Sequence, residues 1–134
     1  MTEPFAFPDI ETDLTGHLAA LLTERSDTAE VATRVPNPRP PRLVRLVRVG
    51  GPLRNRAVDQ PRIVFECWDD GGDLEAAALA RTVRALITSA APGYIGTAWC
   101  DAVHDRGLAF SPDPGTGTSR YLVTVELLVG GSTL

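Results

Sequence analysis

The sequence contains no lysine, so each of its 13 positively charged side chains is an arginine. A phosphate-binding P-loop requires a lysine after its glycines, and this class of nucleotide site is therefore excluded. Histidine is scarce as well, because His17 and His104 are the only two and neither belongs to an HxxxH or HExxH motif. A zinc site would have to gather both histidines with Cys67 and Cys100 from four scattered places in the chain. We therefore expect no metal and no cofactor.

Long hydrophobic runs are also absent. No apolar stretch approaches the roughly 20 residues that a membrane-spanning helix requires. Residues 1–13 are acidic and lack the apolar run of a signal peptide. The two cysteines are accordingly expected to be reduced thiols of a chain made in the cytoplasm. Cys67 lies in an apolar strand pattern, which favours a small buried side chain over a nucleophile.

Sequence motifs that are typical of catalytic sites are also missing. The carboxylates of Asp69, Asp70 and Asp73 could in principle bind magnesium, but the sequence DDGGD is more typical of a turn followed by a helix cap. Ser111 and Ser119 lie in a turn-rich loop and outside a GxSxG motif. The sequence thus predicts a protein that is not an enzyme.

The charges that are present are unevenly distributed. The whole chain has a net charge of −4 and a pI of about 5.1, which argues against a dedicated DNA-binding protein. Between Arg34 and Arg62, however, eight arginines accompany a single acid, Asp59. The molecule should therefore carry a basic segment between acidic flanks. A bias in the composition of the coding DNA would also explain why every basic residue is an arginine.

Apolar periodicity predicts two helices and five strands. Asp9 is the expected N-cap of the first helix, and Asp73 that of the second. Four prolines between residues 36 and 41 exclude both a helix and an interior strand there, and predict an extended connector. The expected elements are a helix over 10–24, a short strand over 30–35, strands over 43–49 and 62–68, a helix over 74–89, and strands over 97–103 and 121–129.

This order predicts an α+β fold, in which two helices pack on one face of a mixed or antiparallel sheet of four to five strands. Residues 1–134 would form one domain. Residues 1–8 are expected to be a flexible lead-in and residues 130–134 a loose tail. Two long loops are expected at 51–61 and 107–119, and long loops in small domains are often functional.

The strand at 43–49 mixes arginines and apolar residues on both of its sides. We interpret Val44 and Leu46 as part of a half-apolar sheet face, shared with Trp68 of the next strand and Leu122 of the last. An apolar face rimmed by arginine and containing an aromatic residue is typical of a protein interface. A passive solvated face and a phosphate contact are the two alternatives.

Several motifs resemble those of one protein family. The segments VPNPRPPR, RVGG and FECW, the helical ALARTVRALI and the closing RYLVTVELLV are similar to the tail terminator proteins of actinobacterial siphophages. The resemblance covers residues 31–129 and implies the same kind of α+β fold. It also implies a virion protein of the head-to-tail junction, assembled in the host cytoplasm.

Members of that family form hexameric rings that stop polymerisation of the tail-tube protein and face the head connector. The resemblance therefore implies three partners: further copies of this chain, the major tail tube protein and a head completion protein. DNA would pass through the lumen of the ring without specific binding. Loops 51–61 and 107–119 would contact neighbouring subunits or the tube.

The same resemblance nominates interface residues. Arginines of the basic segment would pair with carboxylates of a neighbouring copy, since closed rings are built from head-to-tail contacts. The candidates for subunit or tube contacts are Arg42, Arg45, Arg48, Arg54, Arg56, Arg62, Trp68, Asp69 and Asp70. The rival prediction is a small nucleic-acid-binding or nucleotide-binding domain that uses the arginine-rich hairpin 42–56.

Overall fold

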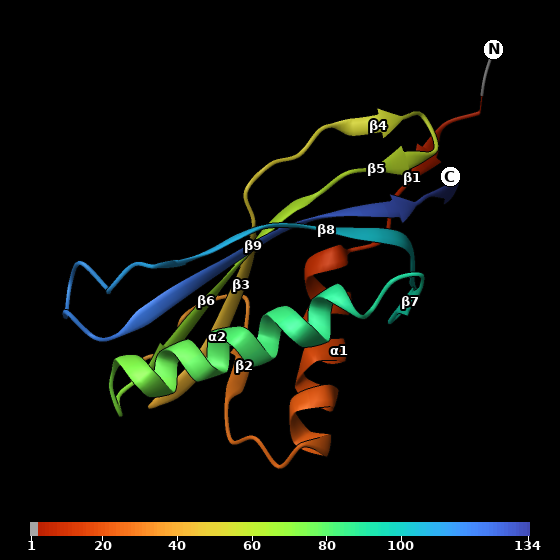
Figure 1. Ribbon diagram of the computed structural model, residues 1–134. Coiled ribbons are helices and arrows are strands. Elements are labelled where there is room, and N and C mark those ends of the chain that lie inside the picture. Colours follow the sequence, from red (N-terminus) through yellow and green to blue (C-terminus); the bar gives the residue numbers. More distant parts are fainter. Residues whose placement is uncertain (1–2) are drawn as a thin grey trace.

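Two helices lie on one face of a mixed, strongly curled sheet in the computed structural model, which describes residues 3–134 (Figure 1). The α+β class is as predicted, whereas the sheet has eight strands rather than four to five. The elements are β1 (Phe5–Ala6), α1 (Ile10–Glu24), β2 (Glu30–Ala32), β3 (Arg42–Arg48), β4 (Leu53–Asn55), β5 (Val58–Asp59), β6 (Arg62–Asp69), α2 (Asp73–Thr88), β7 (Gly93–Ile95), β8 (Ala98–Phe110), β9 (Arg120–Gly130) and β10 (Ser132–Thr133).

The helices form where the periodicity predicts them. Asp9 is the N-cap of α1, because its Oδ1 accepts the Thr12 N–H at 3.2 Å. In α2 the N-cap is Gly72 and not Asp73, which is the first residue of the helix and lies in its acidic first turn. The buried stripes of both helices meet the sheet in one core, with Leu14 and Leu18 from α1 and Leu79 and Val83 from α2. Neither helix within residues 3–134 is long and apolar enough to span a membrane.

The long strand β9 organises the sheet. It pairs antiparallel with β6 and β5 on one side and with β8 on the other. Beyond β6 lie β3 and then β2, which runs parallel to β3 and makes the sheet mixed. Beyond β5 lies β4, and β7 continues the opposite side next to β8.

Both long loops are shorter than expected. The segment 51–61 contains the hairpin β4–β5, and residues 107–110 belong to β8, so that only residues 111–119 form a loop. All three residues of β4 are exposed. The strand therefore lacks the alternation of buried apolar and exposed polar residues from which it could have been predicted.

The chain ends are paired rather than loose. Phe5 lies opposite Thr133 and Ala6 opposite Ser132 in a two-stranded antiparallel sheet. This corrects the expected lead-in and tail for the described part of the chain, while residues 1 and 2 of the lead-in lie outside the described residues. The terminal sheet and the hairpin β4–β5 lie side by side at the end of the molecule that carries both termini (Figure 1).

The first turn of α1 joins the two edges of the curled sheet. The Glu11 carboxylate accepts the outward-facing backbone N–H of Arg48 on β3 at 3.1 Å. Asp13 accepts the N–H and the hydroxyl of Thr97, in the turn between β7 and β8, at 3.2 and 2.8 Å. Gly96 in that turn has φ +59°, and a Cβ there would lie 2.5 Å from an Asp13 oxygen.

We therefore expect Gly96→Ala to lower the free energy of unfolding by about 2 kcal/mol, since alanine is strained at positive φ and its methyl group would displace Asp13. Urea denaturation would measure this loss, and adding Asp13→Ala should make Gly96→Ala less costly. The matched control is Gly16→Ala on the exposed side of α1, where nothing lies within 4 Å, and which should gain up to about 1 kcal/mol. A Gly96→Ala loss that is the same with and without Asp13 would contradict the contact.

Candidate functional site

The register of β3 with β6 decides which arginines share a face of the sheet. Val44 lies opposite Cys67 and Leu46 opposite Phe65, and cross-strand partners point to the same side. Both residues are fully buried beneath the helices. The interpretation of Val44 and Leu46 as part of an interface face is therefore wrong.

The opposite side, here called the outer sheet face, is not covered by a helix of the described residues. Its cross-strand pairs are Leu43 with Trp68, Arg45 with Glu66 and Val47 with Val64. On β9 the same rows continue with Arg120, Leu122 and Thr124. This face mixes apolar and charged residues, as the sequence predicts. Trp68 and Leu122 belong to it, but the apolar residues of β3 on this side are Leu43 and Val47 and not Val44 and Leu46.

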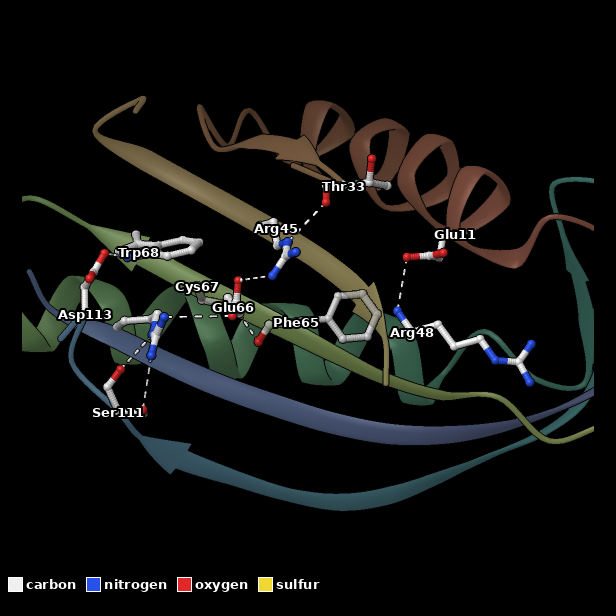
Figure 2. A network of polar contacts seen from close by, with 11 residues as sticks. Glu11, Thr33, Arg45, Arg48, Phe65, Glu66, Cys67, Trp68, Ser111 and Asp113 are labelled. Atoms are coloured by element: carbon white, nitrogen blue, oxygen red, sulfur yellow. Dashed lines mark hydrogen bonds and ion pairs between the residues drawn. The ribbon is translucent and has the colours of Figure 1, made fainter. Parts of the chain in front are cut away.

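Glu66 is the centre of a polar network on the outer sheet face (Figure 2). Its carboxylate lies 3.0 Å from Arg45 Nη1 and 3.8 Å from Arg120 Nη1. The arginines also bind the loops at either end, because Arg45 Nε donates to the Thr33 carbonyl at 3.1 Å and Arg120 Nε to the Ser111 carbonyl at 2.8 Å. Glu66 thus connects β3 and β9 through β6, and it holds Arg45 within its own chain.

The Trp68 side chain is buried and not exposed on the surface. Only 3% of the residue is exposed. The guanidinium carbons of Arg39 and Arg120 lie 5.9 and 5.4 Å from its ring, at distances typical of cation–π contacts. Its indole N–H donates to Asp113 at 3.2 Å. Trp68 therefore fastens the loops 33–41 and 111–119 to the sheet and is not exposed for a partner in the single chain.

Arg42 and Arg48 lie on the helix-covered face, at its two ends. Arg42 donates to both oxygens of Asp27 at 2.8 Å and to Asp69 at 2.7 Å. Arg48 forms a two-pronged pair with Asp59 at 2.7 and 2.9 Å, and the Asp59 side chain is only 7% exposed. Both arginines have carboxylate partners in the same chain and do not need a neighbouring copy to neutralise them.

The remaining candidate interface residues differ in their exposure and in the partners that they already have. Arg62 lies 3.7 Å from Glu126 and is 46% exposed, and Asp70 binds Arg39 at 2.8 Å with half of its side chain exposed. Arg56 donates to the Glu3 carbonyl at 2.8 Å and lies over the Phe5 ring. Arg54 is exposed on β4 and has no side-chain hydrogen bond or ion pair within residues 3–134.

The charge balance of the free surface follows from these pairs. Within residues 3–134, eight of the 13 arginines pair with seven of the 17 acids. Ten acids and five arginines keep no ionic partner, so the surface left for other molecules is acidic. The basic segment of the sequence is not a basic patch of the structure, which disfavours the rival nucleic-acid function.

The carboxylates of Asp69 and Asp73 already accept hydrogen bonds, and both thiols are buried. Asp69 accepts from Arg42 and from the Gly71 N–H, and Asp73 accepts from the Ser119 hydroxyl. No group of three or more His, Cys, Asp or Glu residues that could hold a metal occurs in the part of the chain that the structure describes. Burial raises the pKa of both thiols, Cys67 and Cys100, which leaves them protonated at neutral pH.

Sequence reasoning missed one pair of exposed aromatic residues. Tyr94 and Trp99 lie directly opposite each other on β7 and β8. They are 67% and 40% exposed, although large aromatic side chains are usually more buried. The available signal was two aromatics flanking the turn residues Gly96 and Thr97, which is typical of a tight hairpin.

We expect Arg48→Met to lower the free energy of unfolding by about 3 kcal/mol, because it leaves the buried Asp59 carboxylate without its cation. Adding Asp59→Asn should restore part of the loss. The control is Arg62→Met, whose long and exposed pair should contribute less than about 1 kcal/mol. Urea denaturation measures all three variants, and equal losses for Arg48→Met and Arg62→Met would contradict this account.

Asp27 should make stability depend on pH. Its hydrogen bonds from Arg42 are the main reason that its pKa lies below the ordinary value of 3.8. The unfolded chain therefore binds the proton more readily, so this stabilisation is present above about pH 4 and is lost as the pH falls through the lowered pKa. We expect Asp27→Asn to cost about 1–2 kcal/mol at pH 7 and clearly less at pH 3. Urea denaturation at both pH values tests this, and a pH-independent difference would exclude it.

Comparison with known proteins adds no assignment. No protein-family model and no curated protein matches this chain in sequence. The resemblance in VPNPRPPR and FECW therefore stays a prediction, and the function has to be argued from the surfaces described above.

Proposed function

We propose that this chain is a structural subunit that closes into a ring with further copies of itself and caps the tail tube of a siphophage. The sequence resemblance is the source of this proposal. The structural observation that supports it best is a projecting hairpin, β4–β5, which carries an exposed leucine and an arginine without an ionic partner among residues 3–134, at the end of an otherwise acidic molecule. We call this hairpin the arm and define it as residues 53–59.

The arm has the features of a contact element. Its outer strand β4 pairs only with β5 among the described residues, so one row of backbone N–H and C=O groups is open to a partner strand. Leu53 is 55% exposed, and the nearby Val49 is 49% exposed. The arm extends past the helical layer (Figure 1). The outer strand β4 of the arm is exposed throughout and is well placed to reach a neighbouring molecule, whereas β5 ends at the buried Asp59.

Charge favours a contact between copies. Arg54 is one of five arginines without an ionic partner, whereas ten acids keep none in the described chain. An arm that presents Arg54 therefore meets a complementary acidic surface on another copy. Complementary charges mainly set the partner and the association rate. The arm and an acidic surface are different patches, and such head-to-tail contacts generate rings when the rotation closes.

Capping of the tail tube would follow from the different shapes of the two faces of the ring. A ring adds to the end of a tube when one of its faces matches the tube subunits, and it halts growth when its other face does not. That second face would meet a head completion protein, and DNA would pass the lumen. In the rival nucleic-acid function, Arg54 and Arg56 are the arginines of hairpin 42–56 that have no ionic partner in the described part of the chain, and two arginines offer few phosphate contacts.

We expect Leu53→Asp combined with Arg54→Glu to abolish ring formation and to give overlong tails. Both residues are exposed, so the unfolding free energy should stay within about 0.5 kcal/mol of the wild type. Analytical ultracentrifugation and electron microscopy of the protein mixed with tail tubes would measure assembly, and virion images would measure tail length.

The matched control is Leu74→Asp with Arg81→Glu on α2. It changes an exposed leucine, 82% accessible, and another arginine without an ionic partner in the described chain. Rings and tails of normal length are expected from this control. Normal assembly by the arm variant, or an equal defect in the control, would refute the role of the arm.

A further inference from the structure

A hollow between the two helices is lined by two arginines that lack an ionic partner in the described chain. We call it the interhelix groove. It has a volume of about 350 Å³, and the residues that line it are Arg25, Ala78, Arg81, Thr82, Ala85 and Leu86. Arg25 is the C-cap of α1, and the other five belong to α2. None of these described lining residues is acidic, so the groove is basic on a molecule whose net charge is −4.

The positive charge of the interhelix groove is left free by the chain itself. Arg25 and Arg81 are exposed, and neither forms an ion pair or a side-chain hydrogen bond within residues 3–134. Glu75 precedes the groove on α2, but its side chain lies over the loop before the helix, where a carboxylate oxygen would be 3.4 Å from a Cβ at Gly72. The two guanidinium groups are therefore open to carboxylates of another molecule.

A second hollow continues the groove toward β3. It shares Arg25 and Thr82 with the interhelix groove and is also lined by Asp27 and Arg42. Asp27 is already neutralised, because its two carboxylate oxygens each accept a hydrogen bond from Arg42 at 2.8 Å. Three arginines thus accompany a single acid along the described lining of both hollows, and the basic character extends beyond one pair of side chains.

The rest of the groove determines the class of ligand. Ala78, Ala85 and Leu86 give it an apolar floor, and Leu86 packs against the core. A small anion such as phosphate would leave this floor uncovered, and a nucleic acid would find few cations to contact. A protein segment with carboxylates beside an apolar side chain covers the floor and meets both arginines, whose planar fork suits carboxylates.

The groove is separate from the surface that the proposed ring uses. In Figure 1 the C-terminal end of α1 lies on the far side of the helical layer from the hairpin β4–β5. Its charge has the same sign as that of Arg54, so the arm of another copy is not complementary to it. A partner in the groove would leave the arm accessible.

The chain itself is poorly suited to supply the acidic segment. Its acids that lie close in sequence to exposed apolar residues are engaged within the chain. Asp73, next to Leu74, accepts from the Ser119 hydroxyl, and Asp101 accepts from the Trp99 indole N–H at 2.7 Å. These contacts would have to break before a second copy could fill the groove.

We propose that the interhelix groove binds an acidic segment of a different protein, with carboxylates paired to Arg25 and Arg81 and an apolar side chain on the floor between them. This inference goes beyond the proposed ring and does not depend on it. It gives the helical layer a partner of its own, on a face that contacts between copies through the arm leave open.

The test uses the full chain and a labelled peptide, Glu-Leu-Glu-Glu-Leu-Glu, followed by fluorescence anisotropy at low salt. Binding is expected to be saturable and to weaken as salt screens the charges. Arg25→Ala and Arg81→Ala should each weaken it about fivefold or more. Ala85→Glu should abolish it by placing a like charge on the floor. A peptide with glycine at both leucine positions should bind more weakly.

The matched control is Arg54→Ala, which removes an exposed arginine that also lacks an ionic partner within residues 3–134. Peptide affinity should not change in this variant, and urea denaturation should show that all variants stay folded. No saturable binding, equal weakening by Arg54→Ala, or equal affinity for the glycine peptide would overturn the groove. Self-association of the chain that disappears when Arg25→Ala is combined with Arg81→Ala would overturn the choice of a different protein.

The same assay separates the groove from the proposed function. The arm variant, Leu53→Asp with Arg54→Glu, should keep the peptide while it loses rings. The α2 variant, Leu74→Asp with Arg81→Glu, should lose the peptide while it keeps rings. Loss of both activities in either variant would contradict the separation of the two surfaces.

Discussion

The pairing of arginines with carboxylates of the same chain is the constraint on which the other surfaces depend. Strand β3 carries three arginines in seven residues and still lies inside the sheet, between β2 and β6. This is possible because each guanidinium meets an acid from another part of the chain: Arg42 meets Asp27 and Asp69, Arg45 meets Glu66, and Arg48 meets Asp59. Charges as deep as Asp59 are tolerated only when paired. The same pairs remove from the surface the basic character that the sequence suggests.

Local patterns predicted those elements that have a strong period. The bounds of α1 follow from one apolar stripe and a capping aspartate, and β9 follows from the alternation of buried Val123, Val125 and Leu127 with half-exposed neighbours. The strands of two or three residues were not predictable, because β4 is exposed and β1 pairs with the distant β10. A strand that short has no period of its own, and only its partner stabilises it.

The candidate site was harder to predict than the fold, since it depends on register. Both sides of β3 mix arginine with apolar residues, so its pattern alone does not say which side faces the helices. The pairing of Leu46 with Phe65 decides this, and a shift of one residue would exchange the faces. The carboxylate partners are also distant in sequence, as Asp27 is from Arg42 and Glu66 is from Arg120. Side-chain types could be listed from the sequence, but their partners could not.

The edges of the sheet show which contacts the fold discourages. Beyond Cys100, β8 has no further strand on its outer side in the described chain, but it carries exposed Asp105 and Arg106 and two irregularities in its register with β9. Charges and bulges of this kind prevent open edges from pairing with other chains. On the opposite edge, the short strand β2 covers only residues 43–45 of β3. Beyond it, the Glu11 carboxylate accepts the outward-facing N–H of Arg48. Association along these edges is thus disfavoured by the residues that form them.

In the proposed ring, contacts between copies would use the end of the molecule that carries the arm. That end presents the arm beside the terminal sheet (Figure 1). Because the arm and an acidic surface are different patches, a contact between them is head-to-tail, and such a contact repeats until it closes or is stopped. The excess of unpaired acids gives every copy the same net negative charge, so the local attraction of Arg54 for an acidic surface would act against a general repulsion at low salt. The proposed ring would then form most readily where an existing tube end holds the subunits close together, and this would couple closure of the ring to the end of tube growth.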